Sequence, residues 1–385
     1  MVVLAPRSSP RFKVAQQGVG EAKSQFSARP RLRFQRSADD RAGMRTLLVS
    51  DREVAALLPM KECIDVMAEA FRILARGGAL LPLRTVMALT GSPNLLAVMP
   101  GQLGGHSPES RRSALGAKVI TVFPGNDETP FDSHMGVVLL FEAELGRLLA
   151  VIDASSVTAI RTAAVSGVAT HALARPDAGD LALLGAGVQA MAHLEAMRVV
   201  RQLRRVRVWS RSAERARLFA EQAGRRFGLT IESVGSPDVC VLGADIVCTV
   251  TASRVPVLQG AWLAEGCHVN AVGAALASAR ELDTDAVQRC RLFVDRRESA
   301  LAEAGDVLIP MSEGAIGADH ILGELGEVLL GAMAGRESSA DLTLFKSLGL
   351  AVEDLAAARH IYEKGVALGT GIWVSLGGQR EATPA

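Results

Sequence analysis

The feature of this sequence that most restricts its fold is a short apolar run followed at once by a glycine turn. Residues 181–184 read LALL, and GAGVQA follows at 185–190. The pattern is typical of a buried strand, a G-x-G-x-x-A turn and the start of a helix. Gly185 suits the tight turn, Gly187 lets a ligand approach the backbone, and Ala190 lets helix and strand pack closely. It predicts a dinucleotide site with the pyrophosphate at the helix N-terminus, although such glycines can also serve only as turns.

The chain after Asp180 alternates between short strands and helices. Helices are expected at about 188–203, 212–227, 284–290 and 297–304. The expected strands read LALLG, RVRVWS, LTIES, ADIVCTV, CHVNAV and RLFVD. This alternation predicts an α/β fold with a Rossmann-type parallel sheet that is covered by helices on both faces.

The first half of the chain has a different pattern. Residues 60–76 repeat apolar side chains at helical spacing, and 84–152 breaks into short apolar runs that are typical of a sheet. An Ala-rich helix is expected from Asp153 to about Ala174, and a last helix over 350–368. A length of 385 residues gives room for about two domains.

The N-terminal segment, residues 1–43, differs in composition from the rest. Residues 1–45 hold 10 Lys and Arg against 3 Asp and Glu. An organellar transit peptide has this composition, but an upstream start codon before a true start at Met44 explains it equally well. We favour the second reading and expect a disordered extension without a chemical role. The rest of the chain is mildly acidic, which gives no support for nucleic-acid binding.

Other classes of protein find little support in the sequence. The five cysteines form no C-x-x-C pair, and the seven histidines show no metal-ligand spacing. We therefore expect reduced thiols and no metal. No run of about 18 apolar residues occurs, so a membrane partner is not expected and the predicted location is cytoplasmic.

The end of the second expected strand bears on the choice of cofactor. NAD sites usually carry an acidic residue there, which holds the 2′-hydroxyl of the ribose. This chain has Ser210 and Arg211 instead, in VWSRS. A hydroxyl and a guanidinium suit a 2′-phosphate, so the sequence favours NADP(H), with NAD(H) as the alternative. Arg211 could also be an ordinary surface arginine.

Three cations are candidates for the substrate side. The chain has 36 Arg and only 6 Lys, so Lys118 stands out in the apolar run ALGAKVITVF. A buried lysine loses its proton more readily, which suits proton transfer, although it could also reach solvent from a strand end. Arg84 and Arg161 could each grip a carboxylate by a bidentate fork, or each could form a structural salt bridge.

These segments together resemble the ornithine cyclodeaminase/mu-crystallin family. The resemblance covers about Met44 to Gly371. The matching stretches are LPLRT, AVMP, GAKVITVFPGN, TAIRTAAVSGVAT, LGAGVQA, VWSRS, GADIVCTVTAS, VNAVGA with RELD, and LTLFKSLGLAVEDLAAA.

The resemblance implies an NAD(P)-binding Rossmann domain over 171–335. It also implies a substrate-binding and dimerisation α+β domain built from 44–170 with 336–376, in a homodimer. Arg84 and Arg161 match the family's carboxylate-binding arginines, Lys118 matches its substrate-contacting lysine, and Leu348 lies beside the substrate. The positions that match cofactor contacts are Thr162, Val188, Gln189, Ser210, Thr249, Val272, Gly273 and Ser347.

One departure from the family pattern concerns Ala275. Cyclodeaminases carry an aspartate six residues before the glutamate that is Glu281 here, and alanine cannot exchange a proton in its place. The resemblance therefore implies a reductase of a cyclic ketimine, Δ1-pyrroline-2-carboxylate or Δ1-piperideine-2-carboxylate, which forms L-proline or L-pipecolate. The alternatives are an ornithine cyclodeaminase with catalytic NAD, an amino-acid dehydrogenase, and a non-catalytic binding protein.

Overall fold

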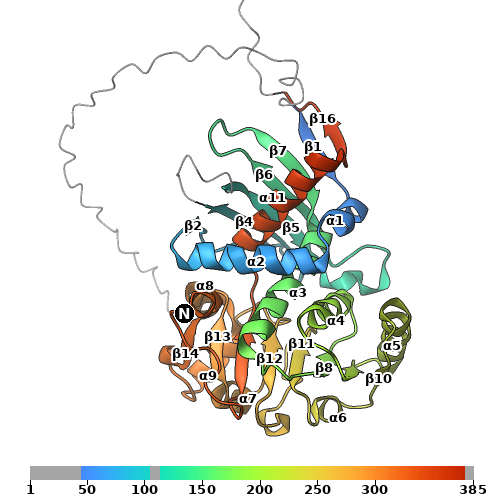
Figure 1. Cartoon of the computed structure of the whole chain (residues 1–385), viewed down its shortest axis with the longest axis vertical. Helices are drawn as coiled ribbons and strands as arrows, with labels where there is room; N and C mark the ends of the chain where they lie inside the picture. Colours follow the sequence, from blue (N-terminus) through green and yellow to red (C-terminus); the bar gives the residue numbers. More distant parts are fainter. Residues whose placement is uncertain (1–44, 105–112, 378–385) are drawn as a thin grey trace, which may run out of the picture. The chain divides into compact units, whose positions relative to one another are not determined.

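The computed structural model describes residues 45–104 and 113–377, which form two sheets and the helices around them (Figure 1). The N-terminal segment expected over 1–43 lies outside the described residues. None of the described helices is long and apolar enough to cross a membrane. The described residues contain no cluster of three or more His, Cys, Asp or Glu that could hold a metal ion.

The first sheet is formed by the two ends of the described chain. Its strand order is β16-β1-β7-β6-β5-β4-β2, and β3 pairs with β4 beside this path. Among the described strands, the β1–β7 pair is parallel and the other pairs are antiparallel. The strands are β1 (Thr46–Val49), β2 (Ala79–Leu80), β3 (Thr85–Ala88), β4 (Leu95–Leu103), β5 (Ala114–Val122), β6 (His134–Phe141), β7 (Leu148–Asp153) and β16 (Ile372–Val374).

The second sheet is parallel throughout its described strands, as the alternation of strands and helices predicts. Its order is β10-β9-β8-β11-β12-β15-β13-β14, so the order reverses between β8 and β11. Ligands bind at such a reversal in this type of sheet. The strands are β8 (Asp180–Leu184), β9 (Arg205–Trp209), β10 (Ile231–Ser233), β11 (Ile246–Thr249), β12 (His268–Ala271), β13 (Arg291–Val294), β14 (Ile321–Glu324) and β15 (Thr343–Lys346).

The helices begin and end where the sequence provides caps. Asp153 accepts a hydrogen bond from the backbone N–H of Ser156 and starts the long central helix, and Gly369, with φ of 67°, ends the last one. The helices are α1 (Asp51–Leu57), α2 (Met60–Ala75), α3 (Ala154–Leu173), α4 (Val188–Val200), α5 (Ala213–Phe227), α6 (Pro237–Val241), α7 (Thr284–Arg289), α8 (Arg297–Glu303), α9 (Gly305–Ser312), α10 (Leu325–Leu329) and α11 (Ala351–Leu368).

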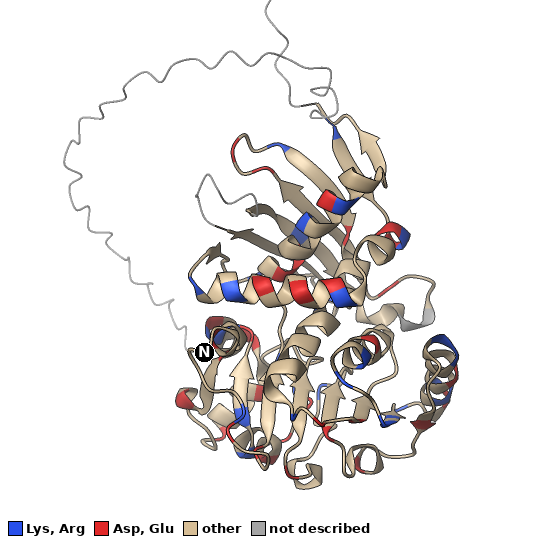
Figure 2. Ribbon diagram, in the orientation of Figure 1, with Lys and Arg blue, Asp and Glu red and all other residues tan. Residues whose placement is uncertain are grey.

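The helices differ in how deeply they are buried. Charged residues of both signs occur along α2 and α5 (Figure 2), and α5 buries only Ala216, Phe219 and Ala223. By contrast, α3 and the first half of α11 are almost entirely buried. These two helices contact each other, and α11 also lies against β4, β5 and β6.

The return of the chain to the first sheet comes later than the sequence indicates. The expected boundary assigns 336–376 to the first domain, but β15 lies between β12 and β13 in the second sheet. Only after Lys346 does the chain cross to α11. The four residues of this crossing, Ser347–Leu350, are called the crossing loop below.

Candidate active site at the crossing loop

The glycine turn has the geometry that the sequence predicts. Gly185 has φ of 123°, and a Cβ atom there would lie 2.7 Å from the carbonyl oxygen of Val250. Only glycine fits both constraints. A Cβ at Gly187 would meet nothing within 4 Å, so the backbone is open there, and α4 begins at Val188. Open backbone at a helix N-terminus is suited to a phosphate.

Three side chains at predicted cofactor positions each have a buried polar atom without a hydrogen-bond partner among the described residues. They are the hydroxyls of Thr162 and Ser347 and the side-chain oxygen of Gln189. Buried polar atoms are nearly always hydrogen-bonded, so an orphaned group needs an explanation. All three lie at positions where the family resemblance predicts cofactor contacts. These residues therefore fit a polar ligand such as a dinucleotide.

The end of β9 leads directly into α5. Ser210 is partly buried and Arg211 is exposed, and Ser212 caps α5 by accepting a hydrogen bond from the N–H of Arg215 at 3.2 Å. A pocket between α4 and α5 begins beside this corner. Its lining residues are Ala186, Gly187, Val188, Met191, Arg215, Leu218, Phe219 and Gln222.

The remaining predicted cofactor positions follow β11 and β12. Thr249 is the last residue of β11, and Val272 and Gly273 follow the end of β12. Both N–H groups of Val272 and Gly273 donate to the carbonyl oxygen of Thr249, at 3.0 and 3.2 Å. Ala190 is buried against the core at the first turn of α4. The predicted cofactor positions thus come from the carboxyl ends of neighbouring strands and from α3 and α4.

Lys118 is on the inner face of β5, opposite Met99 on β4 and Val138 on β6. Its side chain is 2% exposed, and Nζ lies 2.8 Å from Oδ2 of Asp354 and 3.5 Å from the hydroxyl of Thr158. Burial, followed by the charge of nearby Arg161, lowers the pKa of Lys118 to about 8, against the opposing effect of Asp354. A lysine with such a pKa can exchange a proton near neutral pH.

Arg161 lies in the same buried cluster. Nε donates to Oδ1 of Asp354 at 3.0 Å, and Nη1 pairs with Oε2 of Glu353. Although burial disfavours the charge, these two carboxylates raise the pKa of Arg161 above its usual value. Burial raises the pKa of Glu353 to about 7. A Cβ at Gly349 would overlap Nη1 and lie 2.8 Å from Nη2, so the glycine leaves room for the guanidinium.

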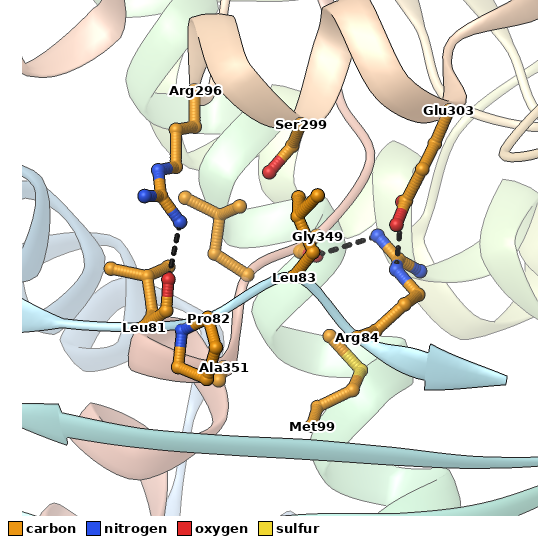
Figure 3. A pocket seen from close by; sticks show the side chains of 11 residues that line it. Leu81, Pro82, Leu83, Arg84, Met99, Arg296, Ser299, Glu303, Gly349 and Ala351 are labelled. Atoms are coloured by element: carbon orange, nitrogen blue, oxygen red, sulfur yellow. Dashed lines mark hydrogen bonds and ion pairs between the residues drawn. The ribbon is translucent and has the colours of Figure 1, made fainter. Parts of the chain in front are cut away.

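Arg84 connects the two halves of the site (Figure 3). Its Nη2 donates to the carbonyl oxygens of Leu348 and Gly349, both at 3.1 Å, and Nε lies 2.8 Å from Oε2 of Glu303 on α8. A small pocket surrounds this contact. It is lined by Leu81, Pro82, Leu83, Arg84, Met99, Arg296, Ser299, Glu303, Gly349, Leu350 and Ala351.

The crossing loop is held from the other side by Asp295. This buried carboxylate follows β13 and accepts hydrogen bonds from the N–H groups of Leu348 and Gly349 at 2.6 and 2.8 Å. One loop therefore contacts Asp295 through its N–H groups, Arg84 through its carbonyl groups and Arg161 through the Cα of Gly349. It also carries Ser347 and Leu348, two of the predicted site residues.

The structure brings the three predicted cations together but pairs both arginines within the chain. Sequence reasoning missed their acidic partners, which are Asp354, Glu353 and Glu303, and it missed Asp295 as the support of the crossing loop. The signals that could have revealed the first two were Arg161 itself, which lies in an apolar helix and needs a partner, and the pair of acids that opens the last helix.

The comparisons with known proteins agree with this arrangement. The sequence model of the ornithine cyclodeaminase/mu-crystallin family matches residues 44–368. Ketimine reductase mu-crystallin of Mus musculus is 41% identical over 287 residues, which cover 74% of this chain and 86% of the mouse protein.

Two solved structures are similar over nearly their whole length. Thermococcus litoralis Δ1-pyrroline-2-carboxylate reductase, in complex with NADH and L-proline, superposes with a TM-score of 0.81 at 38% identity, covering 85% of this chain and 99% of that one. An archaeal alanine dehydrogenase dimer with bound NAD gives a TM-score of 0.80 at 32% identity, covering 86% and 100%.

Proposed function

The chain belongs to the ornithine cyclodeaminase/mu-crystallin family, and from this membership we propose that it reduces a cyclic ketimine with a nicotinamide dinucleotide. The substrates are Δ1-pyrroline-2-carboxylate or its six-membered homologue, and the products are L-proline or L-pipecolate. The observation that carries the proposal is the buried pair of Lys118 and Arg161, joined by Asp354. A reductase relative and a proline-bound neighbour support the same reaction.

A nicotinamide dinucleotide, which Thr162, Gln189 and Ser347 would help to hold, would supply the hydride that reduces C2 of the imine. Arg84 and Arg161 hold the substrate carboxylate through donors that their internal partners leave available, since a guanidinium has five N–H groups. Lys118 donates a proton from Nζ to the imine nitrogen and later recovers one from solvent. Asp354 keeps the ammonium of Lys118 oriented at 2.8 Å and stabilises its charge before transfer.

The position of Ala275 favours reduction over cyclodeamination. No carboxylate stands at this position to assist the departure of ammonia, and Ala275 packs against the apolar core of the second sheet. Reduction of an imine needs one hydride and one proton, and Lys118 can supply the proton by itself. The site as built therefore has the groups that reduction requires.

A comparison of substrates tests the proposed reaction. Purified protein receives Δ1-pyrroline-2-carboxylate with NADPH, and in a separate assay L-ornithine with NAD. We expect oxidation of NADPH in the first and no ammonia in the second. Ammonia release from L-ornithine without accumulation of NADH would identify a cyclodeaminase instead. NADH formed from a simple amino acid such as L-alanine would identify a dehydrogenase, and binding without turnover a carrier protein.

We further propose NADP(H) as the preferred cofactor. The relevant feature is the end of β9, where this chain has Ser210 and Arg211. An acidic residue in their place would repel a 2′-phosphate. The neighbour structures contain NADH and NAD, so the preference rests on this corner alone. The KM values of the wild type and Arg211→Ala for NADPH and NADH test it. A rise of about tenfold for NADPH alone is expected, because one charge-assisted hydrogen bond is lost.

A further inference from the structure

Glu281 is a fully buried carboxylate that the proposed reaction does not use. Its two oxygens accept four hydrogen bonds. Oε2 accepts from the hydroxyl of Thr249 at 2.8 Å and the N–H of Gly273 at 2.7 Å. Oε1 accepts from the N–H and the hydroxyl of Thr251, at 2.7 and 2.6 Å. One side chain thus holds together the loops that follow β11 and β12.

A second buried acid fixes Glu281 itself. Oδ1 of Asp306, on α9, accepts from the N–H groups of Glu281 and Leu282 at 2.8 and 3.0 Å. Its Oδ2 lies 2.8 Å from Nζ of Lys346, the last residue of β15. Glu281, Asp306 and Lys346 are each at most 1% exposed. Such groups are expensive to bury, so their retention at one place calls for a reason.

Glu281, Asp306 and Lys346 lie beneath the strand ends that would receive the nicotinamide half of the predicted cofactor. Strands β8 and β9 carry the phosphate turn and the Ser210 corner, which serve the adenosine half. Strands β11, β12 and β15 lie beyond the reversal of strand order and supply Thr249, Gly273 and Ser347. Glu281 bonds directly to the first two of these residues. Lys346 is the neighbour of the third, whose hydroxyl has no protein partner.

The backbone at Gly273 is packed too tightly to admit any side chain. A Cβ there would lie 2.6 Å from the carboxylate of Glu281 and would overlap the carbonyl oxygen of Thr251. The backbone at Val272 and Gly273 is therefore pressed against Glu281 on its inner side, and its outer side is exposed at Gly273. A small movement of the Glu281 carboxylate would displace the surface that faces the cofactor.

We propose that Glu281, supported by Asp306 and Lys346, is a positioning residue that sets the orientation of the nicotinamide half of the cofactor without touching it. The inference rests on the proposed function, because it presumes that a nicotinamide dinucleotide binds at this edge of the sheet. It assigns Glu281 to one half of that cofactor only. The adenosine half, held at Gly187 and the end of β9, is independent of it.

The test compares a whole cofactor with its adenosine half. Binding of NADPH and of adenosine 2′,5′-bisphosphate is measured by calorimetric titration for the wild type, Glu281→Gln and the control Glu265→Gln. Glu265 is exposed, so its variant makes the same chemical change away from the site. For Glu281→Gln we expect about a tenfold weaker affinity for NADPH, the equivalent of one hydrogen bond to a charged group, and an unchanged affinity for adenosine 2′,5′-bisphosphate.

Equal weakening of both ligands in Glu281→Gln would mean general damage and would overturn the inference, as would unchanged binding of both. If that variant does not fold, Thr251→Val removes one donor to Oε1 and should weaken NADPH selectively, by about threefold. If Thr251→Val changed the affinities for the two ligands by the same factor relative to the wild type, the inference would also be overturned. Wild-type protein that binds neither ligand would overturn the proposed function itself, together with this inference.

Discussion

At the scale of single residues, the chemistry depends on how burial changes Lys118. The carboxylate of Asp354 lies between its ammonium group and the guanidinium of Arg161, and the cost of burying the charge exceeds the attraction of Asp354. An arginine at this position would stay charged, because its pKa is too high for burial to release the proton. The position therefore suits a group that gives and recovers a proton in each cycle.

The pH dependence of the reaction follows from this pKa. The ammonium form of Lys118 is present below about pH 8 and is lost above it. Reduction needs that form, so kcat/KM should fall about tenfold per pH unit above this value, and oxidation of the amino acid should rise there. Lys118→Arg should be slow and should lack this limb. An unchanged profile in Lys118→Arg would show that another group titrates.

Gly349 offers a test of the carboxylate clamp. Its φ is 80°, and a Cβ would overlap the guanidinium of Arg161. We expect Gly349→Ala to raise the KM for the ketimine at least about tenfold, because displacement of the clamp costs more than about 1.4 kcal/mol, with NADPH affinity retained.

The matched control for this variant is Gly331→Ala. Gly331 has φ of 71° but nothing within 4 Å of a Cβ, so the two substitutions share the backbone strain of about 1–2 kcal/mol and differ in the clash. Equal kinetic effects of the two variants would assign the loss to strain and would contradict the role of Gly349.

The sequence predicted the residues with local signals and missed those without them. Gly185 and Gly187 were found because strand, turn and helix are adjacent in the chain, and Lys118 because lysine is rare in it. Asp354 was missed because it lies 193 residues from Arg161, whose Nε donates a hydrogen bond to it, and no periodicity links the two. The role proposed for Glu281 was missed for the same reason, since its partners Thr249, Thr251 and Asp306 lie 25 to 32 residues away in the chain.

At the scale of elements, α3 joins the two sheets through buried polar contacts. Its Ser166 lies 2.9 Å from Nε2 of His193 on α4, and Thr170 accepts from Asn270 of β12 at 2.9 Å. Burial lowers the pKa of His193 to about 4 and that of His268, beside Asn270, to about 3. Both rings are therefore neutral in the folded protein at physiological pH.

These histidines predict a loss of stability in mild acid. Unfolded histidine takes up a proton below about pH 6.5, whereas the folded rings resist it down to about 4 and 3. The contribution of these two rings to the free energy of unfolding should therefore be constant above about pH 7 and should fall below it, by up to about 1.4 kcal/mol per pH unit for each ring. Denaturant unfolding between about pH 7 and pH 5 measures the slope.

His193→Gln should reduce that slope, and the control His171→Gln should leave it unchanged, because His171 is exposed. A slope that persists in full in His193→Gln would assign the acid sensitivity to other groups.

The elements themselves were largely predictable. The expected strands of the parallel sheet are confirmed as β8 to β13, and the helix expected over 350–368 is α11. The short strands β14 and β15 were not predicted, because each has four residues and α10, which lies between them, has only five, so the segment carries little pattern. Because β15 was not predicted, the expected domain boundary at 336 placed the return of the chain to the first sheet too early.

At the scale of the whole molecule, the edge of the first sheet has an apolar surface that we propose as the contact with a second copy. All four residues of β3 are exposed. Leu80 on β2 and Val86 and Met87 on β3 are 69%, 48% and 54% exposed, and both strands pair with β4 at this edge. The archaeal alanine dehydrogenase neighbour is a dimer.

The surface can be tested by a single charge. Met87→Lys places an ammonium in the proposed contact, and burying it there is costly, so light scattering should show a shift from dimer to monomer. Leu145→Lys is the matched control, because Leu145 is 86% exposed on the β6–β7 turn. A wild-type monomer, or a dimer that survives Met87→Lys, would place the interface elsewhere or exclude it.

The crossing loop limits how this enzyme can be recombined with its relatives. Asp295 from the dinucleotide half accepts from the N–H groups of this loop, and Arg84 from the other half donates to its carbonyl groups. The guanidinium of Arg161 occupies the space that a side chain at Gly349 would need. A chimaera joined at Lys346 would therefore pair a foreign Asp295 equivalent with a native loop. Exchange of the cofactor half between family members should therefore keep 347–350, Asp295, Arg84 and Arg161 from the same parent, so that all contacts to this backbone are retained together.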